Sequence, residues 1–157
     1  MVIANRKLGN IAEAKKWIDQ LLWIDPLHHF ANLEMHLLDP SNSNLERLQK
    51  LIQNEFPEQT YLELAISYFN RRLNEEAVTT LNNQTHPMTV IWSAYLMDDP
   101  YILEKAIQKS PAYVHPFRRE SISVLEWAVM ENDSWKFKYL LALNYWAKNR
   151  EEDALKL

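Results

Sequence analysis

The stretch YLELAISYFNRRLNEEAVTTL, residues Tyr61 to Leu81, predicts two amphipathic helices joined by a short turn near Arg72. In each half, apolar and small residues recur at the spacing of one face of a 3.6-residue helix. Glu75 and Glu76 fall in the first turn of the second helix, where the helix dipole favours negative charge. A hairpin this small cannot bury its apolar faces alone, so we expect neighbouring hairpins to cover them. The residues with this spacing are Tyr61, Leu64, Ala65 and Tyr68, then Ala77 and Leu81.

The composition favours a folded, helical chain. Of 157 residues, 47% are hydrophobic and 24% are charged, a balance that supports a buried core rather than disorder. A single Gly argues against a β-rich fold, because the tight turns of such folds depend on glycine. The absence of Cys excludes disulfide bonds, thiolate zinc sites and cysteine nucleophiles.

Charge and hydropathy set expectations for partners and location. The formal net charge of −4 provides no basic surface for nucleic acid. No apolar run reaches the length of a membrane span, and residues Met1 to Asp19 contain no signal-peptide core. We therefore expect a cytoplasmic protein that binds neither nucleic acid nor membranes.

Apolar spacing and helix-breaking residues predict a succession of helices and no strand. The first eight residues are too few for an independent helix. Asp99 has the side chain of a helix N-cap, and we expect the stretch Asn132-Asp133-Ser134 to end one helix and cap the next. Apart from the pair in Tyr61–Leu81, the expected helices are Ile11–Ile24, Leu27–Leu38, Leu45–Phe56, Pro87–Met97, Pro100–Ile107, Phe117–Met130, Trp135–Lys148 and an unfinished helix from Glu151 to Leu157.

Three of these helices fall between Pro87 and Met130, which is an odd number for a strict array of hairpins. One connection among them must then be irregular. The segment from Ser110 to Pro116 contains two prolines, so we expect it to be extended and to cross the stack.

Small and aromatic residues repeat at a spacing typical of a known helical repeat. Ala14 and Leu48 are 34 residues apart with aligned flanks. The chain resembles the tetratricopeptide repeat family. The resemblance implies an all-α superhelix of antiparallel helix hairpins: one domain, residues 1–157, of about five irregular units with incomplete end units. The small residues that let paired helices pack closely are Ala65, Ala77, Ala142 and Ala154.

Two departures from the family pattern concern the turns and the spacing. The usual turn glycine is replaced by Arg72 in the third unit and by Asn149 in the last, and Asn accepts a positive φ more easily than Arg. From Leu48 to Ala77 the spacing shrinks to 29 residues. We expect shortened helices or turns in that unit.

Three stretches carry a narrower resemblance: IDPLHHFA, YLELAISYFNRRLNEEA and SPAYVHPFRRESISVLEWA. They are similar to the repeat region of large bacterial proteins with an N-terminal domain similar to sugar mutarotases. This resemblance implies that the chain is part of a longer protein, with incomplete repeats at both ends. Apolar residues such as Leu155 and Leu157 would then be exposed, and we expect some self-association through the end repeats.

By the family resemblance, the inner face of each hairpin's first helix lines a concave groove for partners. Here that face is apolar or aromatic, which suggests a hydrophobic groove for a helix or an extended peptide. The alternative is that neighbouring helices or another domain of the parent protein cover it. The groove candidates are Phe30, Leu33, Leu37, Leu62, Ile66, Phe69, Tyr139, Leu143 and Trp146.

Two sets of polar residues are candidates for binding a small group or a metal ion. Arg118 and Arg119 follow the proline-containing segment and could hold a phosphate or a carboxylate of a partner. Acidic residues such as Glu120 lie close to them, so we favour salt-bridged or solvated arginines. His29 and His36 lie two helical turns apart, but the spacing supplies no further zinc ligands, and we expect no metal.

No feature of the sequence indicates catalysis, because paired carboxylates fall at helix starts and a single Gly cannot build a phosphate loop. We expect a non-catalytic protein–protein interaction or scaffold module without cofactors. Its partner would be a protein or peptide, or another domain of the parent chain. The alternative is a structural packing element that supports a carbohydrate-active domain of the same parent chain.

Overall fold

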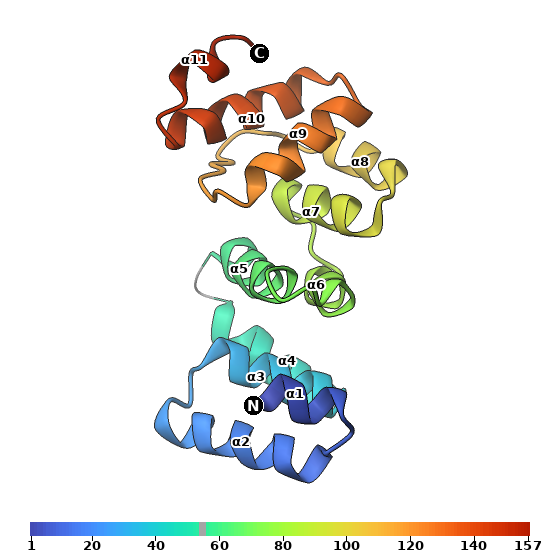
Figure 1. The fold of residues 1–157 in the computed structure, drawn as a ribbon, viewed down its shortest axis with the longest axis vertical. Coiled ribbons are helices and arrows are strands. Elements are labelled where there is room, and N and C mark those ends of the chain that lie inside the picture. The colour runs from blue at the N-terminus through green and yellow to red at the C-terminus, as the bar shows by residue number, and fades with distance from the viewer. Residues whose placement is uncertain (54–55) are drawn as a thin grey trace. The chain divides into compact units, whose positions relative to one another are not determined.

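The computed structural model describes residues 1–53 and 56–157, with only the backbone at Asn42, and this part of the chain is helical without strands (Figure 1). The all-α prediction is confirmed for these residues. The helices are α1 (Val2–Lys7), α2 (Ile11–Ile24), α3 (His29–Leu38), α4 (Asn42–Ile52), α5 (Pro57–Phe69), α6 (Asn74–Leu81), α7 (Pro87–Met97), α8 (Pro100–Ile107), α9 (Ser121–Glu131), α10 (Trp135–Ala147) and α11 (Glu151–Ala154).

The helices form two compact units, Met1–Thr60 and Tyr61–Leu157. In the first unit, α1 packs on α2, α2 on α3, and α3 on α4, and α3 also reaches back to α1. In the second unit, α7 packs on α6 and α8, while α9 packs on both α7 and α8 and then pairs with α10. Most of these contacts join helices that are consecutive in sequence, and α3 and α9 also contact the helix two positions earlier.

Helix α9 packs more extensively on α7 than on α8, whereas α3 packs more extensively on α2 than on α1. Helix α7 packs on α8, and α10 packs on both α9 and α11. The long connection from Gln108 to Glu120 contains the expected non-helical segment Ser110–Pro116 and leads into α9 (Figure 1).

Four turns between consecutive helices share one backbone geometry. In each, one residue has positive φ: 74° at Gly9, 60° at Arg72, 50° at Asp98 and 57° at Asn149. The N–H of the following residue then donates to the carbonyl five positions earlier, as in the Schellman motif, over 2.8 to 3.1 Å. The turns expected at Arg72 and Asn149 are confirmed, and the structure adds the turn at Asp98.

The N-cap predictions at Asp99 and Ser134 are also confirmed. The carboxylate of Asp99 accepts a hydrogen bond from the Tyr101 amide at 3.0 Å, and the Ser134 hydroxyl accepts one from the Lys136 amide at 3.4 Å. Each side chain satisfies one of the amides that a helix start leaves without a partner.

Several predicted helix ends are wrong. Helix α3 begins at His29 rather than Leu27, because His28 caps it: its Nδ1 accepts a hydrogen bond from the Ala31 amide at 3.3 Å. Helix α4 begins before Leu45 and ends at Ile52, so Phe56 is not part of it and is 76% exposed. Helix α11 ends at Ala154.

The expected helix Phe117–Met130 also starts too early, because α9 begins only at Ser121. The carbonyl of Arg118 accepts hydrogen bonds from the Ser121 amide at 3.1 Å and from Asn144 Nδ2, on α10, at 3.2 Å. The tertiary bond to α10 thus holds the chain in a turn where local sequence would permit a helix.

The core of the first unit includes Val2, Ile18 and Ala31, from α1, α2 and α3, and half-buried side chains surround them. Those surrounding side chains are Trp17, Leu21, Leu22, Met35 and Leu38. On α2, Ala14 and Ile18 are buried, whereas the apolar residues at the two ends of the helix are exposed. Ile11 is 52% exposed and Ile24 is 74% exposed.

Candidate functional site

Three aromatic side chains from three helices of the second unit contact one another in a row. Phe69 on α5 lies 6.2 Å from Tyr95 on α7, and Tyr95 lies 5.6 Å from Trp127 on α9, both measured between ring centroids. The interplanar angles of 68° and 75° are the edge-to-face geometry that aromatic pairs prefer. All three rings are half-buried. We call Phe69, Tyr95 and Trp127 the aromatic row.

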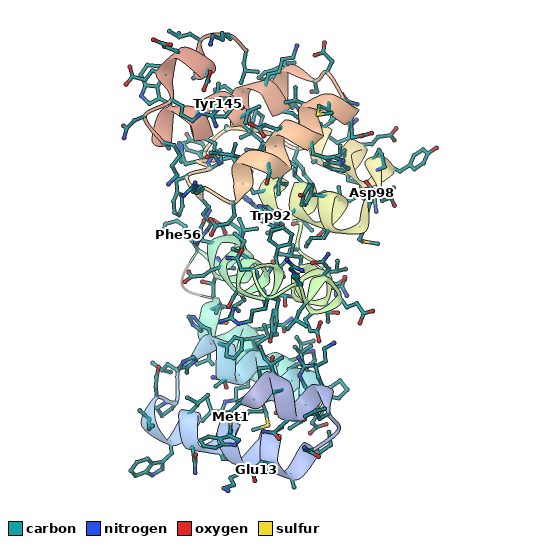
Figure 2. All side chains as sticks on the ribbon, viewed as in Figure 1. Met1, Glu13, Phe56, Trp92, Asp98 and Tyr145 are labelled. Atoms are coloured by element: carbon teal, nitrogen blue, oxygen red, sulfur yellow. The ribbon has the colours of Figure 1, made fainter. Side chains whose placement is uncertain are left out.

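A buried tryptophan supports the aromatic row. Trp92, which lies on α7 (Figure 2), has no exposed surface. Its ring lies 5.5 Å from that of Phe69 and 6.3 Å from that of Tyr95. Its indole Nε1 donates a hydrogen bond of 3.0 Å to the hydroxyl of Ser121, the first residue of α9, which is also buried. This bond joins α7 to α9 and thereby fixes the helices that present Tyr95 and Trp127.

The aromatic row retains polar atoms that a ligand could use. Within the described residues, neither the Tyr95 hydroxyl nor the Trp127 indole N–H makes a hydrogen bond, and neither is a buried unsatisfied atom. Both groups therefore keep some accessible surface. A surface with apolar rings and accessible donors is the composition found at the centres of protein interfaces.

The structure divides the nine groove candidates by exposure. Leu33, Leu62 and Ile66 are buried, at 3%, 3% and 6% exposure, and offer no surface to a partner. Phe30 and Leu37, in the first unit, are half-buried on α3. Among the candidates on α5, only Phe69 reaches the surface.

The three remaining groove candidates lie on α10, a helix that contributes no residue to the aromatic row. Tyr139 is 43% exposed and Trp146 is 58% exposed, while Leu143 is half-buried. Trp135, which is 64% exposed, contacts Tyr139 at 6.4 Å. Trp135, Tyr139 and Trp146 recur at helical spacing on one face of α10, and we call them the α10 stripe.

The two arginines have different surroundings. Arg118 is half-buried, with its Nη2 3.5 Å from the Glu63 carboxylate on α5 and its guanidinium 5.0 Å above the ring of Phe117. Arg119 is exposed. The interpretation of Arg118 as a salt-bridged arginine agrees with this geometry, although its partner comes from a distant helix and not from the neighbouring Glu120.

A further cluster joins α9, α10 and α11. The Tyr145 hydroxyl donates a short hydrogen bond of 2.6 Å to Glu126, and the guanidinium of Arg150 lies 4.1 Å above the Tyr145 ring. Burial, the hydrogen bond to Glu126 and the negative charge of that carboxylate together raise the pKa of Tyr145 to about 12. The phenol therefore stays protonated at neutral pH and acts as a donor that holds these helices together.

Within residues 1–53 and 56–157, no group of three His, Asp or Glu side chains could hold a metal ion. His29 and His36 are both half-buried on α3. Over the same residues, no helix is both long and apolar enough to cross a membrane.

Neither Tyr95 nor Trp127 is among the candidates predicted from the sequence. A signal for Tyr95 does exist in the turn pattern. Phe69, Tyr95 and Trp146 each lie three positions before a residue with positive φ, namely Arg72, Asp98 or Asn149. Recognising Asp98 as a turn residue would have placed Tyr95 beside Phe69 in an alignment of the hairpins.

Comparison with protein-family models, curated proteins and solved structures finds no match for this chain.

Proposed function

We propose that this chain is a non-catalytic protein-binding module, with its hairpins arranged as a tetratricopeptide-like array and the aromatic row as its contact surface. The observation that carries the proposal is the row itself: partly exposed rings from α5, α7 and α9 in mutual contact above the buried Trp92. Aromatic side chains contribute large contact area at low entropic cost and dominate the energy of many interfaces.

Rigidity supports this role. Tyr95 is held between Phe69 and Trp127, and the hydrogen bond from Trp92 to Ser121 fixes α7 against α9. A surface that is already ordered loses little conformational entropy when a partner binds. The partner that fits is a peptide segment of another protein that presents apolar side chains to the rings and a carbonyl or hydroxyl to the Tyr95 or Trp127 donor.

A peptide selection with matched variants tests the proposal. Random peptides are selected for binding to the wild-type chain, and their affinities are then measured for Trp127→Ser and for Tyr101→Ser. Tyr101 is an exposed aromatic residue on α8, 81% accessible, outside the row. We expect Trp127→Ser to weaken binding at least tenfold and Tyr101→Ser to leave it unchanged, with circular dichroism showing both variants folded. Peptides that bind both variants equally well would contradict the proposal.

The α10 stripe favours a second candidate function, packing against a carbohydrate-active domain of the same parent chain. Its three exposed aromatic rings are the kind of surface that another domain covers. Co-expression of the two parts tests it: a stoichiometric complex that is lost in Trp146→Ser but kept in Trp127→Ser supports packing through α10. A complex lost only in Trp127→Ser assigns the contact to the aromatic row instead.

A further inference from the structure

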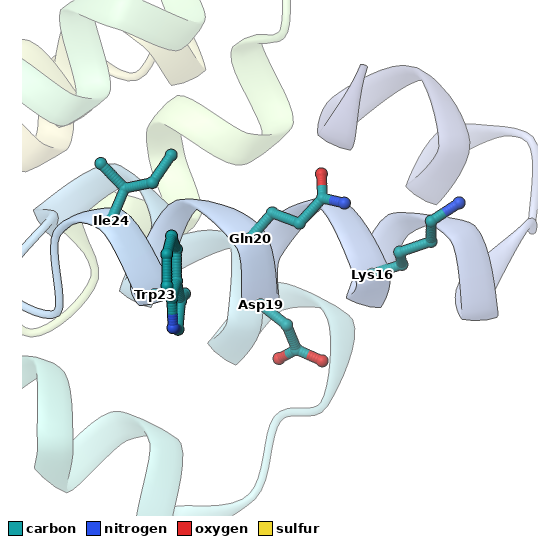
Figure 3. Close-up of a pocket in the computed structure, with 5 residues that line it drawn as sticks. All are labelled: Lys16, Asp19, Gln20, Trp23 and Ile24. Atoms are coloured by element: carbon teal, nitrogen blue, oxygen red, sulfur yellow. The ribbon is translucent and has the colours of Figure 1, made fainter.

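Grooves on the helix surfaces of this chain do not by themselves indicate a ligand. One face of α2 carries an open groove of about 680 Å³ lined by Lys16, Asp19, Gln20, Trp23 and Ile24 (Figure 3). Helix α4 carries a groove lined at the same relative positions, from Ser43 to Leu51. Both shapes therefore follow from the ridges that side chains form on any helix. A more specific binding chemistry lies in the backbone between α8 and α9.

The connection between α8 and α9 contains a segment, residues 114–118, whose side chains alternate in exposure (Figure 1). Val114 and Pro116 are buried and Arg118 is half-buried, whereas His115 and Phe117 are exposed. A period of two is typical of a β-strand with one side against the protein. No turn or bend interrupts these residues, and a residue that precedes proline favours extended backbone. The segment therefore resembles a single strand laid on the second unit.

Contacts with the rest of the second unit hold this segment in place. Arg118 Nη2 lies 3.5 Å from the Glu63 carboxylate on α5, and the Arg118 carbonyl accepts a hydrogen bond of 3.2 Å from Asn144 Nδ2 on α10. At the other end, the Val114 amide donates a hydrogen bond of 3.2 Å to the Pro111 carbonyl and closes a turn. Both ends of the segment are therefore fixed before any partner binds, which lowers the entropic cost of binding.

The two backbone edges of the segment differ in their hydrogen bonds. In a strand, consecutive residues direct their N–H and C=O groups to opposite edges. Val114, Pro116 and Arg118 share an edge where the Val114 amide and the Arg118 carbonyl are bonded within the fold, and where proline has no N–H. His115 and Phe117 share the other edge. Among the described residues, their backbone N–H and C=O groups have no hydrogen-bond partner, and we call this the free edge.

We propose that the free edge binds an extended peptide segment of another protein by β-strand pairing. The backbone groups of His115 and Phe117 offer two N–H donors and two C=O acceptors at the spacing that a second strand presents. A side-chain surface without an extended backbone would leave these groups unpaired, so their chemistry identifies an extended chain as the occupant. A β-branched or aromatic residue opposite Phe117 would add a favourable cross-strand contact.

The free edge is short, so we expect weak binding. Unpaired strand edges are templates for the addition of another strand, and native folds usually cover or shorten them. Within residues 1–53 and 56–157 no strand lies beside this segment. The inference concerns the connection that precedes α9 and stands independently of the aromatic row.

Amide hydrogen exchange measured by NMR tests the pairing with a peptide of alternating valine and threonine, residues of high strand propensity. In the chain alone, the His115 and Phe117 amides should exchange without protection, whereas the hydrogen-bonded Val114 amide should be protected. At saturating peptide, exchange at His115 and Phe117 should slow at least tenfold. Unchanged exchange at both residues would overturn the proposal. Protection that appears at high protein concentration without peptide would assign the edge to a second copy, which also overturns it.

A matched pair of variants separates the backbone from the side chain. His115→Ala and His115→Pro remove the same imidazole, but only proline also removes the N–H from the free edge. We expect His115→Ala and Trp127→Ser to bind the peptide like the wild type and His115→Pro to bind it at least tenfold more weakly, with circular dichroism showing all three folded. Equal binding by His115→Pro and His115→Ala would contradict strand pairing at this edge. Binding lost only in Trp127→Ser would place the peptide on the aromatic row and refute this inference while supporting the proposed function.

Methylation of the peptide nitrogens tests the pairing on the wild-type chain. A strand has two edges, so methylating every second amide leaves one edge able to pair, and binding should persist. Methylating every amide blocks both edges and should abolish binding, although all side chains remain. A fully methylated peptide that binds as well as the unmodified peptide would show that side chains make the contact, and the proposal would be wrong.

Discussion

Arg6 and Glu34 form a two-pronged ion pair that joins α1 to α3. Arg6 Nε lies 2.9 Å from Glu34 Oε2, and Arg6 Nη2 lies 3.2 Å from Glu34 Oε1. The Glu34 side chain has no exposed surface, and the Arg6 side chain is 13% exposed. Parallel bonds from a guanidinium to a carboxylate fix orientation as well as distance. This pair therefore sets the register of α1 on α3.

Removing one member of the pair should be strongly destabilising. Arg6→Met leaves a buried carboxylate without its cation, and we expect the free energy of unfolding to fall by about 3 kcal/mol in urea denaturation. Lys15→Met, which removes one member of the exposed Lys15–Asp19 pair, should cost less than about 0.5 kcal/mol. The double variant Arg6→Met with Glu34→Leu should recover most of the lost stability, because no buried charge remains. Equal effects of Arg6→Met and Lys15→Met would show that the pair has no structural role.

The Trp92–Ser121 hydrogen bond should contribute measurably to the stability of the second unit. Ser121→Ala removes the acceptor and leaves a buried indole N–H without a partner, so we expect a loss of about 1 to 3 kcal/mol. Ser123→Ala, an exposed change on the same helix, is the control. Quenching of tryptophan fluorescence in the folded state should increase only for Ser121→Ala, since α7 and α9 are then less firmly joined. If Ser121→Ala left the free energy of unfolding unchanged, the hydrogen bond would have no role in joining α7 to α9.

Replacing Arg72 or Asn149 with glycine should stabilise the fold, and the gain should be larger at Arg72. Arg72 adopts a φ of 60°, which costs a residue with a Cβ roughly 1 kcal/mol or more, so Arg72→Gly should raise thermal stability. Asn149→Gly should give a smaller gain, because Asn tolerates this conformation better. A scanning calorimetry series that ranked Asn149→Gly above Arg72→Gly would contradict the strain argument.

Gly9→Ala should destabilise the fold, because it introduces the backbone strain that the glycine substitutions at the other turns remove. A Cβ at Gly9 would meet nothing within 4 Å, so no steric clash contributes. The φ of 74° is then the sole source of strain, and we expect a loss of about 1 kcal/mol. Ala12→Gly, an exposed change inside α2, should also destabilise by roughly 0.5 to 1 kcal/mol, but through helix propensity. An unchanged melting temperature in Gly9→Ala would exclude strain at this turn.

Alkaline pH should weaken the folded state through Tyr145. Its pKa of about 12 in the folded protein exceeds the ordinary value of 10.0, so the folded state holds the proton more tightly than the unfolded chain. The resulting stabilisation is complete below pH 10 and declines as pH rises from about 10 to about 12. Urea denaturation at several values of pH should show a steeper alkaline loss for the wild type than for Tyr145→Phe. Tyr101→Phe should behave like the wild type, and a Tyr145→Phe curve parallel to the wild type would disprove the assignment.

Local sequence was sufficient to predict most helices and the turns at Arg72 and Asn149. The pattern of Tyr61 to Leu81 correctly predicts α5 and α6 and the turn at Arg72, because helix periodicity and dipole preference depend on nearby residues. The helix starts at Asp99 and Ser134 are correct for the same reason. Predictions failed where a distant contact decides the backbone. At Arg118, a hydrogen bond from Asn144 holds a turn that local propensity did not indicate.

The candidate site was only partly predictable. Phe69 was predicted as a groove residue through the family resemblance, but the same resemblance selected Leu62 and Ile66, which the fold buries. Spacing identifies which residues share a helix face, whereas exposure depends on which other helix covers that face. Tyr95 and Trp127 became candidates only when α5, α7 and α9 brought their rings into contact.

The sequence by itself determined an all-α chain with helices in largely correct places, because hydrophobic period, caps and turn residues act over a few positions. Tertiary structure alone decided that α9 packs on α7, that Arg6 contacts Glu34 and Arg118 contacts Glu63, and that Trp92 packs against Phe69 of the aromatic row. Each of these joins residues far apart in the chain. Such contacts are selected by the packing of whole helices, a property that no local pattern in the sequence contains.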